Sequence, residues 1–240
     1  MKATFKVKII DDPNPPFTGT TMKVTATDEL KTFGISYLEL CAGSAAITID
    51  WGDGSVERVT AEGEVLHEYA ASGEYTVTLS DDVSALYFSG MEKPAYNVML
   101  TEIVTKSRRM TLDQYCFNRC ENLVKADIAA LAITTIPVSC FKFCYALKEL
   151  VLPDGITALD KACFAQCTAL ETISLPLVDT IKGSSSTSPF YKCSGLKTIH
   201  FAASNEAAIK ASSAYKYSPT LGAENAEVVF DLKLKVKSEK

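Results

Sequence analysis

One short phrase occurs four times in this chain: a phenylalanine, a cysteine three residues later and a leucine three residues after that. The copies begin at Phe117, Phe141, Phe164 and Phe190, so they start 24, 23 and 26 residues apart. Repetition with a period of about 20 to 29 residues is typical of one class of solenoid, in which similar coils stack on one another. The sequence therefore predicts a row of stacked coils.

Each copy also predicts the structure of its own coil. Apolar residues recur at positions i and i+2 after each leucine, so a strand would point both of them inward and the residue between them to solvent. The spacing of three in the phenylalanine–cysteine–leucine phrase predicts a short helical turn with one buried face. Further strands are expected at 100–103 and 227–230, and shorter extended segments at 136–137, 156–159 and 178–181.

Over residues 96–202 the pattern Phe-x-x-Cys-x-x-Leu-x-x-(Ile/Leu)-x-Leu-Pro resembles the BspA-type leucine-rich repeats of bacterial surface proteins. The chain departs from that pattern at Cys116, Cys140 and Cys163, where the family often has alanine, and in an insertion at 183–189. The resemblance implies a right-handed leucine-rich-repeat solenoid with short helical turns. It also implies recognition or adhesion at the cell surface or after secretion.

The N-terminal part predicts a different architecture, since short strands separated by turn signals are typical of a β-sandwich. The expected strands are 4–10, 21–27, 35–41, 46–51, 55–60, 75–80 and 85–89. The stretch from Trp51 to Ser55 reads Trp-Gly-Asp-Gly-Ser, which predicts a hairpin turn.

That turn, together with His67-Glu68-Tyr69 and the segment 73–79, resembles the polycystic-kidney-disease (PKD) domain, an immunoglobulin-like sandwich. In that family both motifs are structural. The expected fold is therefore mainly β, with a PKD-like β-sandwich over 1–92 and a repeat domain with a C-terminal cap over 93–240. The cap is expected to hold a helix over 204–211, a loop over 214–227 and a frayed end over 233–240.

The eight cysteines allow three interpretations. Two at i and i+4 of a helical turn, such as Cys116 and Cys120, would have Cβ atoms about 5–6 Å apart. A disulfide needs about 3.5–4.5 Å, so pairing within a coil is disfavoured while pairing between neighbouring coils stays open. The spacing also permits zinc ligation. Because the cysteines recur in register with phenylalanine and leucine, we expect them to pack in the core.

Other candidate residues favour structural roles. Asp11, Asp12, Asp50 and Asp53 could bind calcium, although turn chemistry explains Asp53 without it. No serine or cysteine is matched to a base and an orienting acid at an informative spacing, so no catalytic, cofactor or metal site is expected and the protein is predicted not to be an enzyme. A metal- or thiol-dependent enzyme would need reactive cysteines.

Composition limits the partners. The chain has 240 residues, 47% hydrophobic content and a net charge of −5, with acids and bases interspersed. These values indicate a globular protein and argue against nucleic acid as a partner. No apolar stretch is long enough to span a bilayer. Residues 1–10 alternate like a strand and unlike a signal peptide, so a cytoplasmic location stays open.

The remaining candidate is the outward face of the repeat strands. A solenoid presents such a face as one extended binding surface. We expect a non-catalytic recognition or adhesion protein that binds a protein or glycan as a monomer, with the sandwich as a spacer. The alternative is a structural subunit of a larger surface or phage-like assembly. The expected partner-binding face consists of Glu102, Val104, Lys125, Asp127, Glu149, Val151, Thr172, Ser174, Thr198 and His200.

Overall fold

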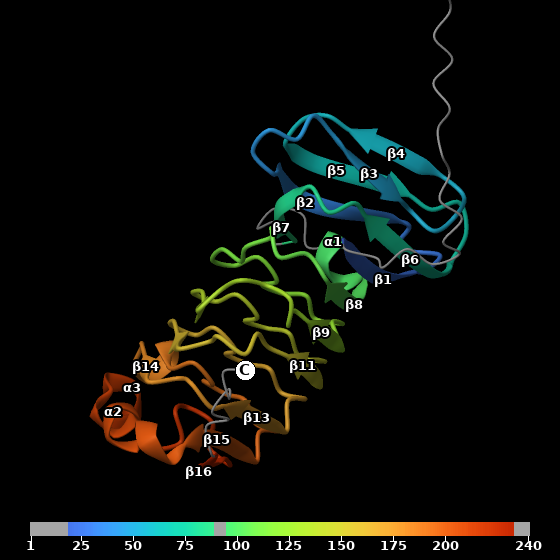
Figure 1. The fold of residues 1–240 in the computed structure, drawn as a ribbon. Helices are drawn as coiled ribbons and strands as arrows, with labels where there is room; N and C mark the ends of the chain where they lie inside the picture. Colours follow the sequence, from blue (N-terminus) through green and yellow to red (C-terminus); the bar gives the residue numbers. More distant parts are fainter. Residues whose placement is uncertain (1–18, 89–94, 233–240) are drawn as a thin grey trace, which may run out of the picture.

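The computed structural model describes residues 19–88 and 95–232. The expected strand at 4–10, the boundary at residues 92 and 93 and the frayed end at 233–240 lie outside these ranges. A two-layered N-terminal part stands at one end of a row of coils, and two helices lie at the opposite end (Figure 1).

The N-terminal part, named here the two-sheet region, consists of two sheets whose inner side chains join one buried core. β1, β6, β3 and β4 form the first sheet, and β5, β2 and β7 form the second. Val24 and Ile49 enter the core from the first sheet, and Phe33 and Val65 from the second. The strands are β1 (Thr20–Ala26), β2 (Thr32–Leu40), β3 (Ile47–Asp50), β4 (Val56–Val59), β5 (Gly63–Glu68), β6 (Gly73–Leu79) and β7 (Val83–Tyr87).

Six of these strands confirm the predicted ones to within a few residues, whereas β5 was missed. Within β5 only Val65 is buried, so its sequence lacks the apolar alternation that marks a half-buried strand. The PKD relationship of this region stays a prediction.

In the coils, parallel strands follow one another in two rows on opposite sides (Figure 1). The first row confirms the predicted repeat strands: β8 (Leu100–Thr105), β9 (Lys125–Asp127), β11 (Glu149–Val151), β13 (Thr172–Leu175), β15 (Thr198–Ala202) and β16 (Glu227–Leu232). The second row confirms the shorter segments: β10 (Thr135–Ile136), β12 (Ala158–Leu159) and β14 (Thr180–Ile181).

A shared sheet joins the two-sheet region to the coils. β1 pairs with β8 in the antiparallel sense, and β8 pairs with β9 in the parallel sense. One seven-stranded sheet, in the order β11-β9-β8-β1-β6-β3-β4, therefore runs from the first coils into the two-sheet region. A one-turn helix, α1 (Ala95–Val98), precedes β8.

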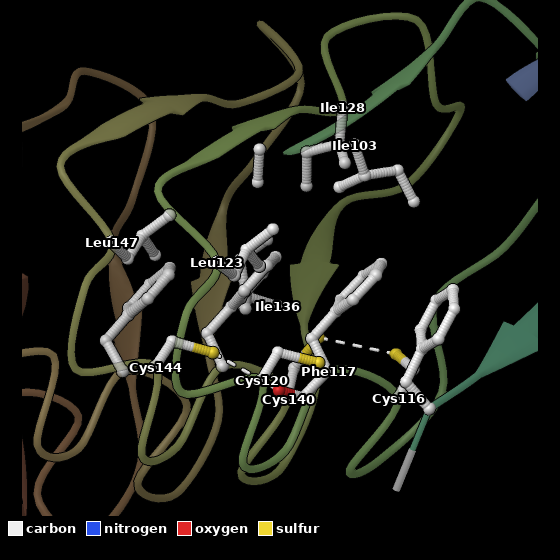
Figure 2. Packing of buried hydrophobic residues seen from close by; sticks show 14 of the residues in the cluster. Ile103, Cys116, Phe117, Cys120, Leu123, Ile128, Ile136, Cys140, Cys144 and Leu147 are labelled. Carbon is white, nitrogen blue, oxygen red and sulfur yellow. Dashed lines mark hydrogen bonds between the residues drawn. The ribbon is translucent and has the colours of Figure 1, made fainter. Parts of the chain in front are cut away.

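The four repeated phenylalanines form a buried column along the coils. Neighbouring ring centroids are 5.1 Å apart for Phe117 and Phe141 and 5.6 Å apart for each of the next two pairs, with rings nearly parallel. Phe88 of the two-sheet region continues the column, 5.6 Å from Phe117. Leu123, Leu147 and the cysteines pack beside these rings (Figure 2).

The predicted helical turns are wrong. The segment after Phe117 has bonds from Cys120 N to Phe117 O and from Leu123 N to Cys120 O, both 3.1 Å, which are those of successive tight turns. Arg119 between them has φ of 63°, which no right-handed helix contains. Its N–H and that of Phe117 instead donate to the next coil, to Lys142 O and Cys140 O. Successive tight turns and a helix both place buried residues three positions apart, so the sequence pattern could not distinguish between them.

The C-terminal cap has more helix than predicted. The expected first helix is present as η2 (Ala203–Asn205) and α2 (Glu206–Ala211), and the inserted segment before Phe190 holds η1 (Ser185–Thr187). The predicted loop is wrong at its start, which forms α3 (Ser213–Tyr217). The Ser212 hydroxyl accepts from Tyr215 N at 3.2 Å and caps that helix. No helix in the described ranges is long and apolar enough to cross a membrane.

We predict that Phe141→Ala lowers the free energy of unfolding by about 3–5 kcal/mol, because it opens a cavity in the phenylalanine column. Phe143→Ala is the matched control, since Phe143 is only half buried and leaves the column intact. Urea denaturation followed by circular dichroism measures both. Equal losses of unfolding free energy in the two variants would contradict the conclusion that the buried rings stabilise the stack of coils.

Candidate functional site

The structure places the ten residues of the predicted binding face in two rows across the repeat strands. Strand register aligns Glu102, Lys125 and Glu149, and it aligns Thr172 with Thr198. The second row aligns Val104, Asp127 and Val151, and then Ser174 with His200. The residues between the rows, such as Ile103, Ala126, Ile173 and Ile199, are buried. We call the ten outward residues the strand face.

The first half of the strand face is a ladder of paired charges. Lys23 of β1 lies 2.9 Å from Glu102, Nζ to Oε1, and this contact raises the pKa of Lys23. Lys125 Nζ lies 3.6 Å from Glu149 Oε2. Positive and negative side chains thus alternate over four neighbouring strands, β1, β8, β9 and β11. Sequence reasoning missed Lys23, because the pairing of β1 with β8 cannot be read from the repeat.

The second half of the strand face is polar and carries little charge. The hydroxyls of Thr172, Ser174 and Thr198 make no hydrogen bond to any residue in the described ranges. His200 Nδ1 lies 2.9 Å from Asp231 Oδ1 on β16. Asp231 also escaped the sequence analysis, since the predicted last strand stopped one residue before it.

The ladder of strands is interrupted between these two halves. Backbone hydrogen bonds join the coils of β11 and β13 as far as Ala169 N to Tyr145 O, and resume at Asp179 N to Thr157 O, both 3.1 Å. Across the described residues between those points, β11 and β13 do not pair. Phe141 and Phe164 of the same two coils stay stacked, and β12 pairs on both sides. The opening is therefore confined to the strand face.

A cavity of about 380 Å³ occupies this opening. We call it the cleft. Its walls combine apolar side chains with polar groups, Val151 among the apolar residues is 44% exposed, and Asp154 supplies the one charged side chain of the lining. The lining residues are Leu150, Val151, Leu152, Pro153, Asp154, Ile156, Thr172, Ile173, Ser174, Leu175 and Pro176. Four of the predicted face residues border or line it: Glu149 next to it, and Val151, Thr172 and Ser174 in its wall.

The Trp-Gly-Asp-Gly-Ser motif is held by hydrogen bonds within the turn. Asp53 Oδ1 accepts from Ser55 Oγ at 2.5 Å and from Ser55 N at 3.0 Å, while Oδ2 lies 2.8 Å from His67 Nε2. The His67 ring stacks on Trp51 at 4.7 Å. The Ser55 hydroxyl and N–H, with His67, hold the pKa of Asp53 at about 2. These contacts favour turn chemistry for Asp53 over calcium binding. Asp11 and Asp12 lie outside the described residues.

All eight cysteines are free thiols and are buried, as core packing requires. Three of those that follow the phenylalanines donate to the preceding coil, among them Cys144 Sγ to Phe117 O at 3.2 Å (Figure 2) and Cys193 Sγ to Phe164 O at 3.0 Å. Burial raises the pKa of the Cys193 thiol to about 12 and that of Cys167 well above its ordinary value. Within the described ranges no three His, Cys, Asp or Glu side chains gather as metal ligands.

Comparison with known proteins finds one family that matches the chain. Residues 94–221, more than half of the chain, match the family described as BspA type leucine rich repeat region, in six copies. A crystal structure of a leucine-rich repeat protein from Bacteroides ovatus is similar with 21% sequence identity and a TM-score of 0.38. The match covers 65% of this chain and 45% of that one, so this chain spans less than half the length of that protein. No curated protein matches the chain.

We predict that Asp53 makes the stability of the protein depend on pH in the acid range. Because its folded pKa is about 2 and its ordinary pKa 3.8, its contribution is complete above pH 3.8 and is lost as pH falls towards 2. Asp53→Asn should therefore be less stable than the wild type at pH 7, and the difference should shrink as pH falls through this window. Thermal unfolding from pH 7 to pH 2 measures it.

Ser55→Ala is the control for this mechanism. It removes the hydroxyl that contributes most to the low pKa and so raises the folded pKa of Asp53 towards 3.8. The acid-dependent loss should therefore be smaller than in the wild type and complete at a higher pH. A difference between Asp53→Asn and wild type that stays constant with pH would contradict the assignment.

Proposed function

The chain belongs to the BspA type leucine-rich repeat family, and we propose that it is a non-catalytic recognition protein whose strand face binds another protein. Proteins with these repeats are typically non-catalytic, and the family suggests a role in protein binding or recognition. Stacked strands provide the extended surface that repeat proteins use for binding.

The observation that carries this proposal is the cleft between β11 and β13. Protein interfaces obtain most of their energy from a few side chains that fill well-packed pockets. The cleft has walls that combine apolar and polar groups and a volume of about 380 Å³, enough for one or two side chains of a partner. Ser174 and Thr172 at its rim offer hydroxyls that have no partner among the described residues.

The two halves of the strand face have different parts in this proposal. The charges of the first half already pair with one another, so a partner must compete with those contacts to use them. The second half has unpaired hydroxyls beside the cleft. We therefore place the centre of binding at the cleft and β13 and assign the charged half to the rim, where ion pairs contribute little affinity.

The N-terminal part serves as a spacer in this proposal. A PKD-like sandwich over 1–92 would hold the repeat domain, 93–240, away from the surface that carries the protein, at the cell surface or after secretion. The contacts of Asp53 with Ser55 in its own turn and with His67 on β5 support a structural role for that motif. The sheet that continues from β1 into β8 supports a stiff connection between the two parts.

We predict that Ser174→Trp abolishes partner binding, because the indole would fill the cleft. The probe is a phage-displayed library of random peptides selected on the immobilised full chain. Selected peptides should lose at least tenfold in affinity for the variant, measured by titration calorimetry.

Thr180→Trp is the matched control. Thr180 is an exposed residue of β14, in the row of strands on the opposite side of the coils, so this variant should keep its affinity. Peptides that bind Ser174→Trp with the same affinity as the wild type would exclude the cleft as the binding site. A glycan array tested in parallel would turn the proposal towards a carbohydrate partner if only glycans bind.

A structural subunit is the second candidate, and the ends of the sheets favour it. β4 and β16 are the terminal strands of their sheets, and each leaves one edge unpaired in the described part of the chain. Val56 on β4 is 64% exposed. Exposed strand edges are templates for pairing with another chain.

We predict that the recognition protein stays monomeric, which light scattering after size-exclusion chromatography measures over a range of concentrations. Val56→Lys places a charge on the β4 edge and should change nothing in a monomer. Oligomers that grow with concentration and disappear in this variant would favour the structural subunit instead.

A further inference from the structure

The seven cysteines of the coils fall into two columns with different contacts. Three of the cysteines that follow a phenylalanine each donate their thiol to a main-chain oxygen of the preceding coil: Cys144, Cys167 and Cys193. The cysteines that precede a phenylalanine are Cys116, Cys140 and Cys163. In this column Cys116 Sγ lies 3.4 Å from Cys140 Sγ, across the step from one coil to the next (Figure 2).

The backbone holds these two residues at a spacing that a disulfide accepts. Phe88 N donates to Cys116 O at 2.8 Å, and Phe117 N donates to Cys140 O at 3.0 Å, so both residues occupy equivalent places in neighbouring coils. Hydrogen-bonded extended chains lie about 4.7–4.9 Å apart. The Cα atoms of a disulfide are about 4.4–6.8 Å apart and its sulfurs about 2.05 Å. Side-chain rotation therefore suffices to close the bond.

We propose that Cys116 and Cys140 form a reversible disulfide between their two coils when hydrogen peroxide oxidises the protein. This pair of cysteines is distinct from the strand face, so the proposal can be tested independently of the proposed function. All eight thiols lie in the described part of the chain, and no other pair of sulfurs there forms a sulfur–sulfur hydrogen bond.

Cys116 is the thiol that peroxide reaches first. It follows the exposed residues Asp113, Gln114 and Tyr115, and its thiol donates to Asp113 O at 2.8 Å. Cys140 is fully buried, and burial raises the pKa of its thiol well above the ordinary value. Both thiols are buried, Cys116 at 1% exposed and Cys140 at 0%, but the exposed residues directly before Cys116 place it nearer the surface, so we assign the first attack to Cys116.

The reaction balances with one peroxide. The Cys116 sulfur attacks a peroxide oxygen, the O–O bond breaks, and water leaves with a sulfenic acid left on Cys116. The Cys140 sulfur then attacks the Cys116 sulfur, the S–O bond breaks, and the hydroxyl leaves as a second water with the Cys140 proton. The two thiols lose two electrons, which reduce one hydrogen peroxide to two waters.

The test treats the native full chain with hydrogen peroxide, unfolds it, blocks free thiols and maps its peptides by mass spectrometry. We expect free thiols to fall from eight to six per chain. The peptides of Cys116 and Cys140 should be linked and two hydrogens lighter than their sum, and dithiothreitol should restore all thiols. Eight thiols after treatment, a link between another pair, or sulfinic acid at Cys116 would each overturn the proposal.

Three variants sharpen the result. Cys116→Ser and Cys140→Ser should each lose the linked species, whereas Cys163→Ser should form it as the wild type does. Cys163 is the control because it belongs to the same column, while among the described residues its sulfur forms no hydrogen bond with that of Cys140. If a serine in the core prevents folding, the peptide map of the wild-type protein decides by itself.

Discussion

Backbone hydrogen bonds between neighbouring coils are the constraint on which the rest of the structure depends. Alternate N–H groups of each turn donate to the next coil, as Phe117 does to Cys140 O and Phe141 does to Cys163 O. This sets a constant spacing, which brings the phenylalanine rings to 5.1–5.6 Å from one another. The left-handed residues in the turns, such as Arg119, direct the N–H groups outward to the neighbour instead of along a helix.

The features that could serve function lie where this constraint is relaxed or ends. Between β11 and β13 the backbone bonds stop on one side of the coil, and the cleft occupies the gap. The bonds continue at the phenylalanine column and at β12, so the core stays closed behind it. A recognition site can therefore form on the surface without a loss of buried packing.

Sequence reasoning predicted that the ten residues of the strand face point outward and stack in a continuous ladder, because side chains alternate along a strand and the repeat sets the register. The structure aligns them in register within each half, but the ladder is interrupted between β11 and β13. Sequence reasoning did not identify Lys23, which reaches Glu102 from the two-sheet region, or Asp231, which holds His200. It also missed the cleft, although Leu152 and Ile173 in its walls belong to the repeat pattern. The roles of Lys23 and Asp231 and the position of the cleft all depend on contacts between segments that are distant in the sequence. A local sequence pattern does not specify such contacts.

The sequence by itself determined the stacking of coils, the buried cysteines and, apart from β5, the strands that the structure describes in both parts. Those features follow from the period of the repeat and from the alternation of apolar and polar residues, which predicts burial. Both are patterns among residues close together in the sequence. Only the tertiary structure decided that the turns are not helical, that β1 joins β8 into one sheet, and that the ladder opens at β13. The physical reason is that a backbone N–H takes whichever acceptor the folded chain brings near it, and a repeat sequence does not specify which coil provides it.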